Sequence, residues 1–423
     1  MTKAASSTKS SLGKSSMPKR KSNGARQLNE PSSAVLRYKG SKHFRQRVVC
    51  SLLSGRPIRI DEIRPFPTTT DYQEEVQMGV MGHEAAFLRL VDKLTNGTQV
   101  EINETGTTLR FKPGYITGGR ANHDCGTTRS LGWFIEGLLP LALFSKTPFN
   151  LSLSGITNDD VDLSVDALKA VTLPLLKHFG VAEEGGLELK VKRRGAPPGG
   201  GGLVEFTCPI VRELKPIDFT DPGLIKRIRG NAYCTKVSPQ IANRVAESSR
   251  GLLNRLLPDV WVHTDHHAGR TGGESPGFAL SLVAESTTGV LLVAETAAEK
   301  VRTASLDDRR VPIGERGVPS HTAVGTLPED LGNLGSKLIL EEIKNGGCVD
   351  SSHQSLAMLL MVLCPEDVSR LRVGKLTRYS VTYLRHLRDF FGAYFRLKPD
   401  PQTSTVLVSC QGIGFKNLSR GAT

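Results

Sequence analysis

Apolar side chains recur every three or four positions in several stretches of the chain, which is the spacing of one helix face. In the first half, this spacing predicts helices at residues 42–53, 72–94, 128–144 and 162–179. Between them, runs rich in β-branched and aromatic residues predict strands near residues 56–63, 99–103, 108–111, 149–154, 187–193 and 203–207. Alternating strands and helices, followed by paired strands, predict an α/β fold built of α+β layers.

The pattern changes after residue 208 and predicts a smaller unit. The expected elements are a strand at 225–235, a helix at 239–257, a strand at 260–263, a polar Gly-rich loop at 264–277, and strands at 278–286 and 289–296. This order suits a small α/β domain at residues 209–308, inserted into a main domain of residues 34–208 and 309–423. We expect residues 301–324 to form a loop that returns the chain to the main domain. The main domain resumes with helices at 327–344, 353–364 and 380–391 and strands at 371–376, 393–397 and 406–409.

Residues 1–33 are rich in Ser, Lys and Gly and contain almost no large apolar side chains. Such a segment cannot offset its ordering entropy by burial, so we expect it to be a disordered basic tail. Its Pro-Lys-Arg-Lys run at 18–21 is typical of a nuclear or nucleolar address or of an RNA-contacting arm, and a solubilising tail is the alternative.

Composition narrows the class of partner. The formal net charge of +13 favours a polyanion, for which RNA is the obvious candidate, although an acidic protein surface fits the same charge. The seven cysteines are scattered and form no C-x-x-C pair, which argues against a zinc ribbon and a disulfide framework and favours a reducing compartment. No apolar run reaches membrane-spanning length and no signal peptide is apparent, so we expect no membrane partner.

Three polar clusters are candidates for chemistry, each with a plain alternative. The run His263-Thr-Asp-His-His267 suggests a metal site, but its spacing matches no zinc motif and favours a polar surface loop. The tract Gly199–Gly202 lacks the Lys-Ser/Thr of a P-loop and belongs either to the scaffold or to a cleft lining. Asp159, Asp160 and Asp162 suit a divalent ion or, preferably, the cap of the helix expected from 162.

The stretch from Arg37 to Glu75 is the most informative part of the chain. A short strand and a turn at Gly40 lead into the first helix, and basic residues surround that helix at both ends. Free N–H groups at a helix start, together with cations, predict an anion site, while a solvated basic face is the alternative.

Several motifs, in order, carry a resemblance to a known family. They are SGRPIRIDEIR (54–64), RFKPGYITGG (110–119), GTTRSLGWFIEGLLPLALF (126–144), LSGITNDD (153–160) and PPGGGGLVEF (197–206). Over roughly residues 35–409 the chain resembles the RNA 3′-terminal phosphate cyclases. The resemblance implies a fold of repeated βαβαββ-like units with a small inserted α/β domain.

The resemblance also implies what the site has kept and lost. Cyclases of this family attach AMP to a histidine near the C-terminus, and Tyr379 stands at that position, with His386 two helical turns further on. A phenol cannot replace the imidazole nucleophile. Arg45 and Arg64 match two family arginines, which makes them, with Lys42, the expected anion- or RNA-binding residues. Other family positions are changed, and their occupants here are Tyr38, Lys42, Pro67, Glu75 and Val76.

This pattern resembles the cyclase-like branch of the family. The branch implies a nucleolar protein needed for early cleavages toward 18S rRNA in the small-subunit processome, without cyclase activity, cofactor or metal. The implied partners are a nucleolar GTPase, pre-rRNA and a small nucleolar ribonucleoprotein, and we expect the helix region 379–395 to bind the GTPase. One alternative is a pre-rRNA endonuclease that uses Arg385, Arg388 and Asp389, with Lys375 or Arg378 nearby. An active cyclase is the other.

Overall fold

A computed structural model describes residues 35–65, 78–181, 186–298 and 327–417. Four expectations therefore lie wholly or partly outside the described residues. They concern the tail at 1–33, the start of the helix expected at 72–94, the return loop at 301–324, and the family positions Pro67, Glu75 and Val76.

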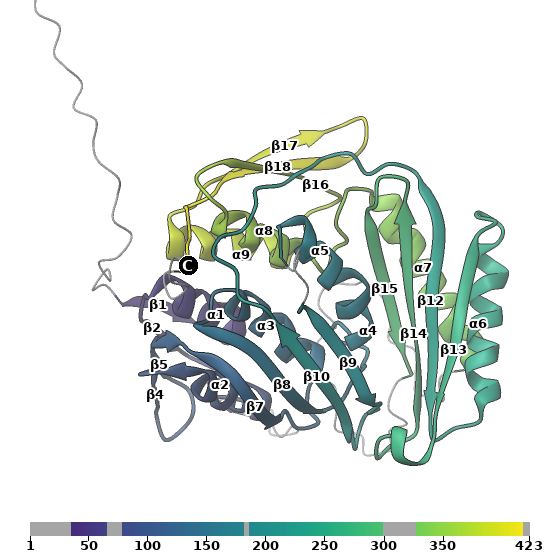
Figure 1. Ribbon diagram of the computed structural model, residues 1–423, viewed down its shortest axis with the longest axis horizontal. Coiled ribbons are helices and arrows are strands. Elements are labelled where there is room, and N and C mark those ends of the chain that lie inside the picture. Colours follow the sequence, from purple (N-terminus) through teal and green to yellow (C-terminus); the bar gives the residue numbers. More distant parts are fainter. Residues whose placement is uncertain (1–34, 66–77, 182–185, 299–326, 418–423) are drawn as a thin grey trace, which may run out of the picture. The chain divides into compact units, whose positions relative to one another are not determined.

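Three four-stranded sheets repeat one topology (Figure 1). In each, the first two strands are parallel, and the last two complete the sheet by antiparallel pairing. Their spatial orders are β1-β2-β5-β4, β7-β8-β10-β9 and β11-β16-β18-β17. Helices connect the strands, so each repeat follows a βαβαββ plan. The fold predicted from the motifs is therefore confirmed.

The first repeat supplies the expected first strand and helix. Its elements are β1 (Leu36–Lys39), α1 (Phe44–Ser54), β2 (Ile58–Asp61), α2 (Gly82–Leu94), β4 (Gln99–Ile102) and β5 (Leu109–Lys112). A two-stranded sheet of β3 (Thr95–Asn96) and β6 (Tyr115–Ile116) follows α2. Helix α1 ends at Gly55, whose φ of 69° is the left-handed conformation that glycine tolerates best.

The second repeat contains the most apolar part of the chain. Its elements are β7 (Gly118–Asp124), α3 (Leu131–Leu143), β8 (Thr147–Gly155), α4 (Val165–Ala167), a π-helical turn η1 (Leu168–Thr172), α5 (Leu173–His178), β9 (Glu188–Arg193) and β10 (Gly202–Cys208). Two glycines of α3 permit close packing. A Cβ on Gly132 would lie 1.7 Å from the Leu163 carbonyl oxygen, and one on Gly137 would lie 2.7 Å from Cδ of Arg45.

The third repeat is interrupted by a fourth sheet. The repeat comprises β11 (Asp218–Phe219), α8 (Gln354–Leu363), β16 (Val368–Val373), α9 (Arg378–Phe391), β17 (Phe395–Asp400) and β18 (Thr405–Gln411). Between β11 and α8 lie β12 (Ile225–Thr235), α6 (Pro239–Leu253), β13 (Val260–His267), η2 (Gly269–Thr271), β14 (Gly277–Ser286), β15 (Leu291–Ala297) and α7 (Pro328–Asn345). Helices α6 and α7 pack on each other and on this sheet, so its packing partners extend past residue 308.

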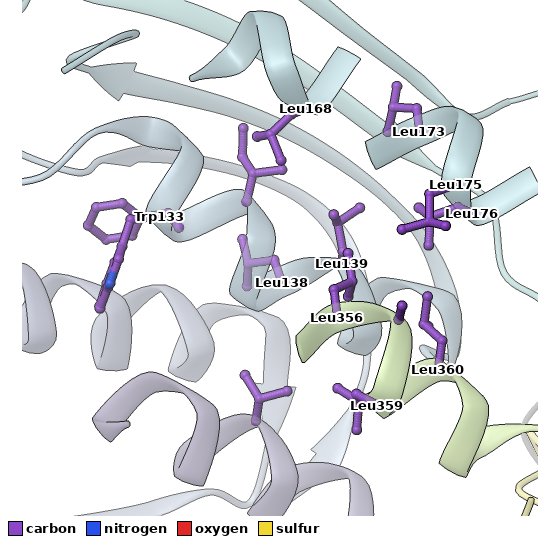
Figure 2. Close-up of a cluster of buried hydrophobic side chains, with 14 of the residues drawn as sticks. Trp133, Leu138, Leu139, Leu168, Leu173, Leu175, Leu176, Leu356, Leu359 and Leu360 are labelled. Carbon is purple, nitrogen blue, oxygen red and sulfur yellow. The ribbon is translucent and has the colours of Figure 1, made fainter. Parts of the chain in front are cut away.

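Leucine side chains of the second and third repeats meet in the interior. Figure 2 shows those of α3, η1, α5 and α8 directed toward one another. The fully or almost fully buried members include Leu138, Leu139, Leu168, Leu176 and Leu360. At about 1.5–3 kcal/mol for each buried apolar side chain, this layer is a main source of stability and holds the helices that position the site.

Four sequence expectations need correction. Strand β7 was not predicted, because an edge strand reading Gly-Gly-Arg-Ala-Asn-His-Asp has no apolar alternation. Strand β13 continues to His267 where a loop was expected, since backbone pairing with β12 holds its polar residues extended. The helix expected at 162–179 begins at Val165 and passes through a π-helical turn. Helix α6 ends at Leu253, four residues before its expected end.

In the part of the chain that the structure describes, no helix combines the length and the hydropathy needed to cross a bilayer.

Candidate functional site

The turn between β1 and α1 brings several side chains to the start of the helix. Gly40 and His43 both take left-handed backbone conformations, with φ values of 71° and 58°. Arg47 closes the turn, because its Nη1 donates to the Gly40 carbonyl at 2.7 Å, and its guanidinium stacks 4.7 Å from the Tyr38 ring. Among the residues that the structure describes, no side chain caps α1.

Helix α9 lies against α1 and supplies Tyr379. Thr377 caps α9 by accepting from the Ser380 N–H at 3.0 Å, which places Tyr379 in the first turn. Its ring centroid lies 4.1 Å from that of His43, and 40% of the residue is exposed. Gln46 can link Tyr379 to α1, since one orientation of its amide donates to the Tyr379 hydroxyl at 3.0 Å and accepts from Arg45 at 2.8 Å.

Arg45 is buried and directed into α3. Its guanidinium pairs with the Glu136 carboxylate at 2.5 Å and also donates to the Trp133 carbonyl oxygen. The same group lies 5.0 Å from the centre of the Trp133 ring. Burial alone would lower the pKa of Arg45, but Glu136 raises it above the ordinary value. Arg45 is therefore a stable cation with partners in its own chain.

The other two expected anion-binding residues are placed differently. Arg64 forms a two-pronged pair with Glu84 of α2, at 2.7 and 2.9 Å, and donates to the Gly79 carbonyl at 2.8 Å. Lys42 is exposed in the turn before α1. The structure thus places Arg45 beside Tyr379, holds Arg64 against α2, and leaves Lys42 in solvent.

Two neutral histidines lie behind Tyr379. Burial, helped by nearby cations, lowers the pKa of His43 to about 3 and that of His386 to about 4. Their rings meet edge to face at 5.2 Å, and Tyr38 contacts His386 in the same way at 5.0 Å. Among the described residues, neither ring nitrogen of His386 has a hydrogen-bond partner. These imidazoles are packed between aromatic rings.

The outer face of α9 is basic. Arg385 and Arg388 are exposed, and neither forms an ion pair with a residue in the described ranges. Asp389 is partly buried: its carboxylate receives a long 3.5 Å contact from the Tyr38 hydroxyl, and its carbonyl accepts from Arg56. Solvent-facing residues that continue this surface are Lys375, Arg378, Tyr394 and Arg396.

The space beside Arg45 is small. A cavity of about 20 Å³ is lined by side chains of α1, α3, α8 and α9, among them Gln46, Glu136, Ser355 and Tyr383. This volume holds a water molecule or two and is far below the several hundred Å³ of a typical small-molecule site. In this conformation the space beside Arg45 is therefore filled by packed side chains.

The other polar clusters have structural roles. Asp159 accepts from the N–H groups of Val161 and Asp162, and Asp162 pairs with Arg129. The expected helix cap is wrong, since Ser164 caps the helix instead. Asp160 is exposed in the same turn.

The glycine tract at 199–202 and the histidine run at 263–267 each form hydrogen bonds within the chain. The Gly199 N–H donates to the Ser275 hydroxyl at 2.8 Å, so the tract packs against the loop before β14. His267 pairs with Asp265 at 2.9 Å along β13. Within the described ranges, no three His, Cys, Asp or Glu residues converge as metal ligands do.

Sequence reasoning missed His43, Gln46, Trp133, Glu84 and Glu136. Glu136 gives the clearest usable signal, because it is a lone charge in the otherwise apolar helix α3. A charge at such a position needs a buried partner, and Arg45 is that partner.

Comparisons with known proteins agree on the family. The family model for RNA 3′-terminal phosphate cyclase matches residues 36–397. A probable RNA 3′-terminal phosphate cyclase-like protein of Dictyostelium discoideum is 48% identical over 387 residues, covering 91% of this chain and 99% of the relative. The human RNA 3′-terminal phosphate cyclase-like protein is 48% identical over 391 residues, with 91% and 97% covered.

A third relative has a more specific name. The rRNA processing protein rcl1 of Schizosaccharomyces pombe is 41% identical over 388 residues, covering 91% of this chain and 97% of the relative. The family model, the repeated βαβαββ topology and the full-length match to cyclase-like proteins all lead to one conclusion: this chain belongs to the RNA 3′-terminal phosphate cyclase family.

Proposed function

We propose that this protein is an rRNA-processing factor that acts in the nucleolus, in early pre-rRNA processing toward 18S rRNA within the small-subunit processome. It works as a cyclase-like scaffold that binds RNA and a nucleolar GTPase, without cyclase activity. The relative named as an rRNA processing protein supports the role in rRNA processing. The basic composition supports an RNA partner.

One observation carries the loss of cyclase activity. Tyr379 stands where the resemblance places the family's nucleophilic histidine, and its ring lies against that of His43 at an interplanar angle of 32°. The hydroxyl end of Tyr379 is buried beside Gln46 and Arg45, although 40% of the whole residue is exposed, and this burial raises the pKa of the phenol above its ordinary value of 10; it is therefore protonated at neutral pH and is a weak nucleophile. Arg45, which matches a family arginine, is already neutralised by Glu136.

The adduct assay tests this part of the proposal. The purified protein is incubated with ATP labelled in its α-phosphate and with magnesium, beside an active cyclase as the positive control. We expect no protein–AMP adduct. A stable adduct that disappears in His43→Ala or His386→Ala would contradict the proposal, because one of the imidazoles near Tyr379 would then be the nucleophile.

The basic face of α9 is the proposed RNA contact. Arg385 and Arg388 are one turn apart and exposed, as phosphate-binding side chains need to be. Changing both to Gln should weaken binding of a pre-rRNA fragment about tenfold at low salt and reduce the salt dependence. Arg89→Gln on the exposed face of α2 is the matched control and should bind as the wild type does.

A pre-rRNA endonuclease is the second candidate. It is favoured by one feature, the sequence Arg-Asp at 388–389 on an exposed helix with Arg385 one turn before it. Magnesium-dependent cleavage of a pre-rRNA fragment, lost in Arg388→Gln and Asp389→Asn but kept in Arg89→Gln, would establish this activity. Fragment binding without cleavage supports the scaffold.

The GTPase partner is tested separately. Helix α9 and Tyr394, which is 77% exposed, combine arginine and aromatic side chains of the kind that dominate protein interfaces. We expect the protein to co-purify from nucleolar extract with a GTPase, and Tyr394→Ala to reduce its recovery. If neither Tyr394→Ala nor Arg385→Gln reduces the amount of GTPase that co-purifies, the GTPase interface lies elsewhere on the protein.

A further inference from the structure

The sheet of β12–β15 has two unlike faces. Helices α6 and α7 cover one of them (Figure 1). The opposite face is covered only in part: Ala167 and Val171, on α4 and the π-helical turn, pack against Val293 of β15. Arg194 then covers Tyr233 of β12, at 4.8 Å from the ring centre.

The outer corner of that second face is open to solvent. Its main feature is Trp261 on the edge strand β13, which is 54% exposed. The chain has two tryptophans, and the other, Trp133, is buried in the helical layer. Single exposed apolar side chains are common on protein surfaces, so the groups around this ring decide what it can bind.

The strand geometry orients the indole ring. Side chains alternate along β13, so Trp261 and His263 share a face. The indole N–H donates to Nδ1 of His263 at 3.2 Å, and the two rings meet at 67°. Because the indole N–H is the only hydrogen-bond donor of this side chain, the flat face of the ring is what remains for a ligand.

Cations stand beside the ring on β12. Arg229 is the register partner of Trp261, and Arg227 lies two residues earlier on the same face. Arg229 pairs with Asp259 at 2.8 Å, and Arg227 pairs with Glu285 at 2.6 Å. All four side chains are partly exposed, so both arginines can be reached from solvent. Arg229 forms a two-pronged pair with Asp259, at 2.8 and 2.9 Å, so a phosphate at Arg229 has to compete with that carboxylate, whereas the Arg227 pair with Glu285 is an ordinary surface pair.

We propose that this corner binds single-stranded RNA, with one base stacked on Trp261 and the adjoining phosphates at Arg229 and Arg227. A flat aromatic ring on an open sheet, flanked by arginines, is the arrangement with which proteins hold unpaired bases. The inference rests on the proposed function, because it adds a second RNA contact to the one on α9.

RNA fits the corner better than a protein segment for two reasons. Arg227, Arg229 and the adjacent Lys226 outnumber the carboxylates of Asp259 and Glu285. The formal net charge of the whole chain, +13, also favours a polyanion as partner. A base also needs only one ring face, which Trp261 offers.

Tryptophan fluorescence provides a direct test on the full chain. A 12-nucleotide single-stranded RNA of mixed sequence should quench the emission of Trp261, while buried Trp133 supplies a constant background. Trp261→Phe should abolish most of the quenching, and Trp261→Ala should weaken binding about tenfold, as expected for one stacked base. Arg229→Gln should lower the salt slope by about one phosphate contact.

Matched variants separate this inference from the proposed function. Tyr115→Ala removes another exposed aromatic ring, 85% accessible on β6, and should leave binding unchanged. Asp259→Asn should tighten binding severalfold by releasing Arg229. If the wild type binds this RNA and Trp261→Ala, shown to be folded by circular dichroism, binds it equally well, the inference fails while the proposed function stands.

Two further outcomes also overturn the inference. Absence of any binding of single-stranded RNA by the wild type refutes both this inference and the RNA-binding role. Quenching of Trp261 by a proline- and aromatic-rich peptide, but not by RNA, assigns the corner to a protein partner.

Discussion

The Arg45 guanidinium is surrounded by groups of its own chain. Glu136 neutralises it, the Trp133 carbonyl accepts from it, and the absence of a Cβ on Gly137 gives its stem room. The side chain of Arg45 is 6% exposed and that of Glu136 is 19% exposed, so each depends on the other for its charge to be tolerated.

Arg45→Met should therefore destabilise the protein by about 3 kcal/mol, because it leaves the Glu136 carboxylate buried without a partner. Urea unfolding at pH 7 measures the loss. The double variant Arg45→Met/Glu136→Gln should lose less than the single variant. Lys39→Met breaks the exposed pair with Glu62 and should leave stability nearly unchanged. Equal losses in the single and double variants would show that packing, and not charge, sets the cost.

His386 gives a residue-scale prediction for pH. Its folded-state pKa of about 4 is below the ordinary 6.5, so the unfolded chain binds the proton more readily. The stability that neutral His386 contributes is fully present above pH 6.5 and is lost as the pH falls toward 4.

Replacing His386 by Phe should therefore make the free energy of unfolding fall less steeply as the pH drops from 6.5 to 4. The change in slope should correspond to at most one bound proton. Urea unfolding at half-unit steps of pH measures the slope. The matched control is Val381→Phe, at an exposed position of the same helix, which adds a phenyl ring without removing a titratable group and should keep the wild-type slope. A slope that is unchanged in His386→Phe would mean that His386 is solvated.

Helix packing explains residues that propensity alone disfavours. Helix α3 contains Gly132, Gly137 and Pro140, yet almost all of it is buried. The two glycines are sites of close approach, one to the Leu163 carbonyl and the other to Arg45. Because α3 contacts both α1 and β8, its close approach determines where Arg45 lies relative to α9.

Two glycine variants test this at the scale of the element. Gly132→Ala should cost about 2–3 kcal/mol, since its Cβ would overlap a backbone carbonyl that cannot move easily. Gly251→Ala in α6 meets nothing within 4 Å and should stabilise the protein by up to about 1 kcal/mol. Thermal unfolding compares them. A stabilising effect of Gly132→Ala would contradict the close packing of α3.

At the scale of the whole molecule, a buried ion pair of the second repeat lies where that repeat meets the fourth sheet. Arg194, which follows β9, pairs with Asp166 of α4 at 2.5 and 2.8 Å and also approaches Asp265 of β13 at 3.5 Å. Nearby, Glu295 of β15 accepts from the Ser164 N–H at 2.9 Å. We propose that residues 209–308 form the inserted domain and that these contacts hold it.

Asp166→Ala should loosen this attachment, because Asp166 hydrogen-bonds Asn231 of β12 and holds Arg194, which approaches Asp265 of β13. We expect a loss of about 3 kcal/mol and earlier proteolytic cleavage on either side of the sheet of β12–β15. Calorimetry should then show two transitions in place of one. Arg244→Gln, which removes an exposed pair with Glu329 between α6 and α7, is the control and should keep a single transition. One shared transition in Asp166→Ala would mean that apolar packing alone couples the sheets.

The sequence by itself determined the layered α/β class, most helices, the strand at 225–235 and the family, because apolar periodicity and motif order are local properties that survive without coordinates. It also singled out Tyr379 and Arg45. It could not show that Glu136 neutralises Arg45, that the His43 ring contacts Tyr379, or that Trp261 stands on an open corner. Those facts join residues far apart in the chain, and only the packing of the repeats decides which distant side chains meet and which remain in water.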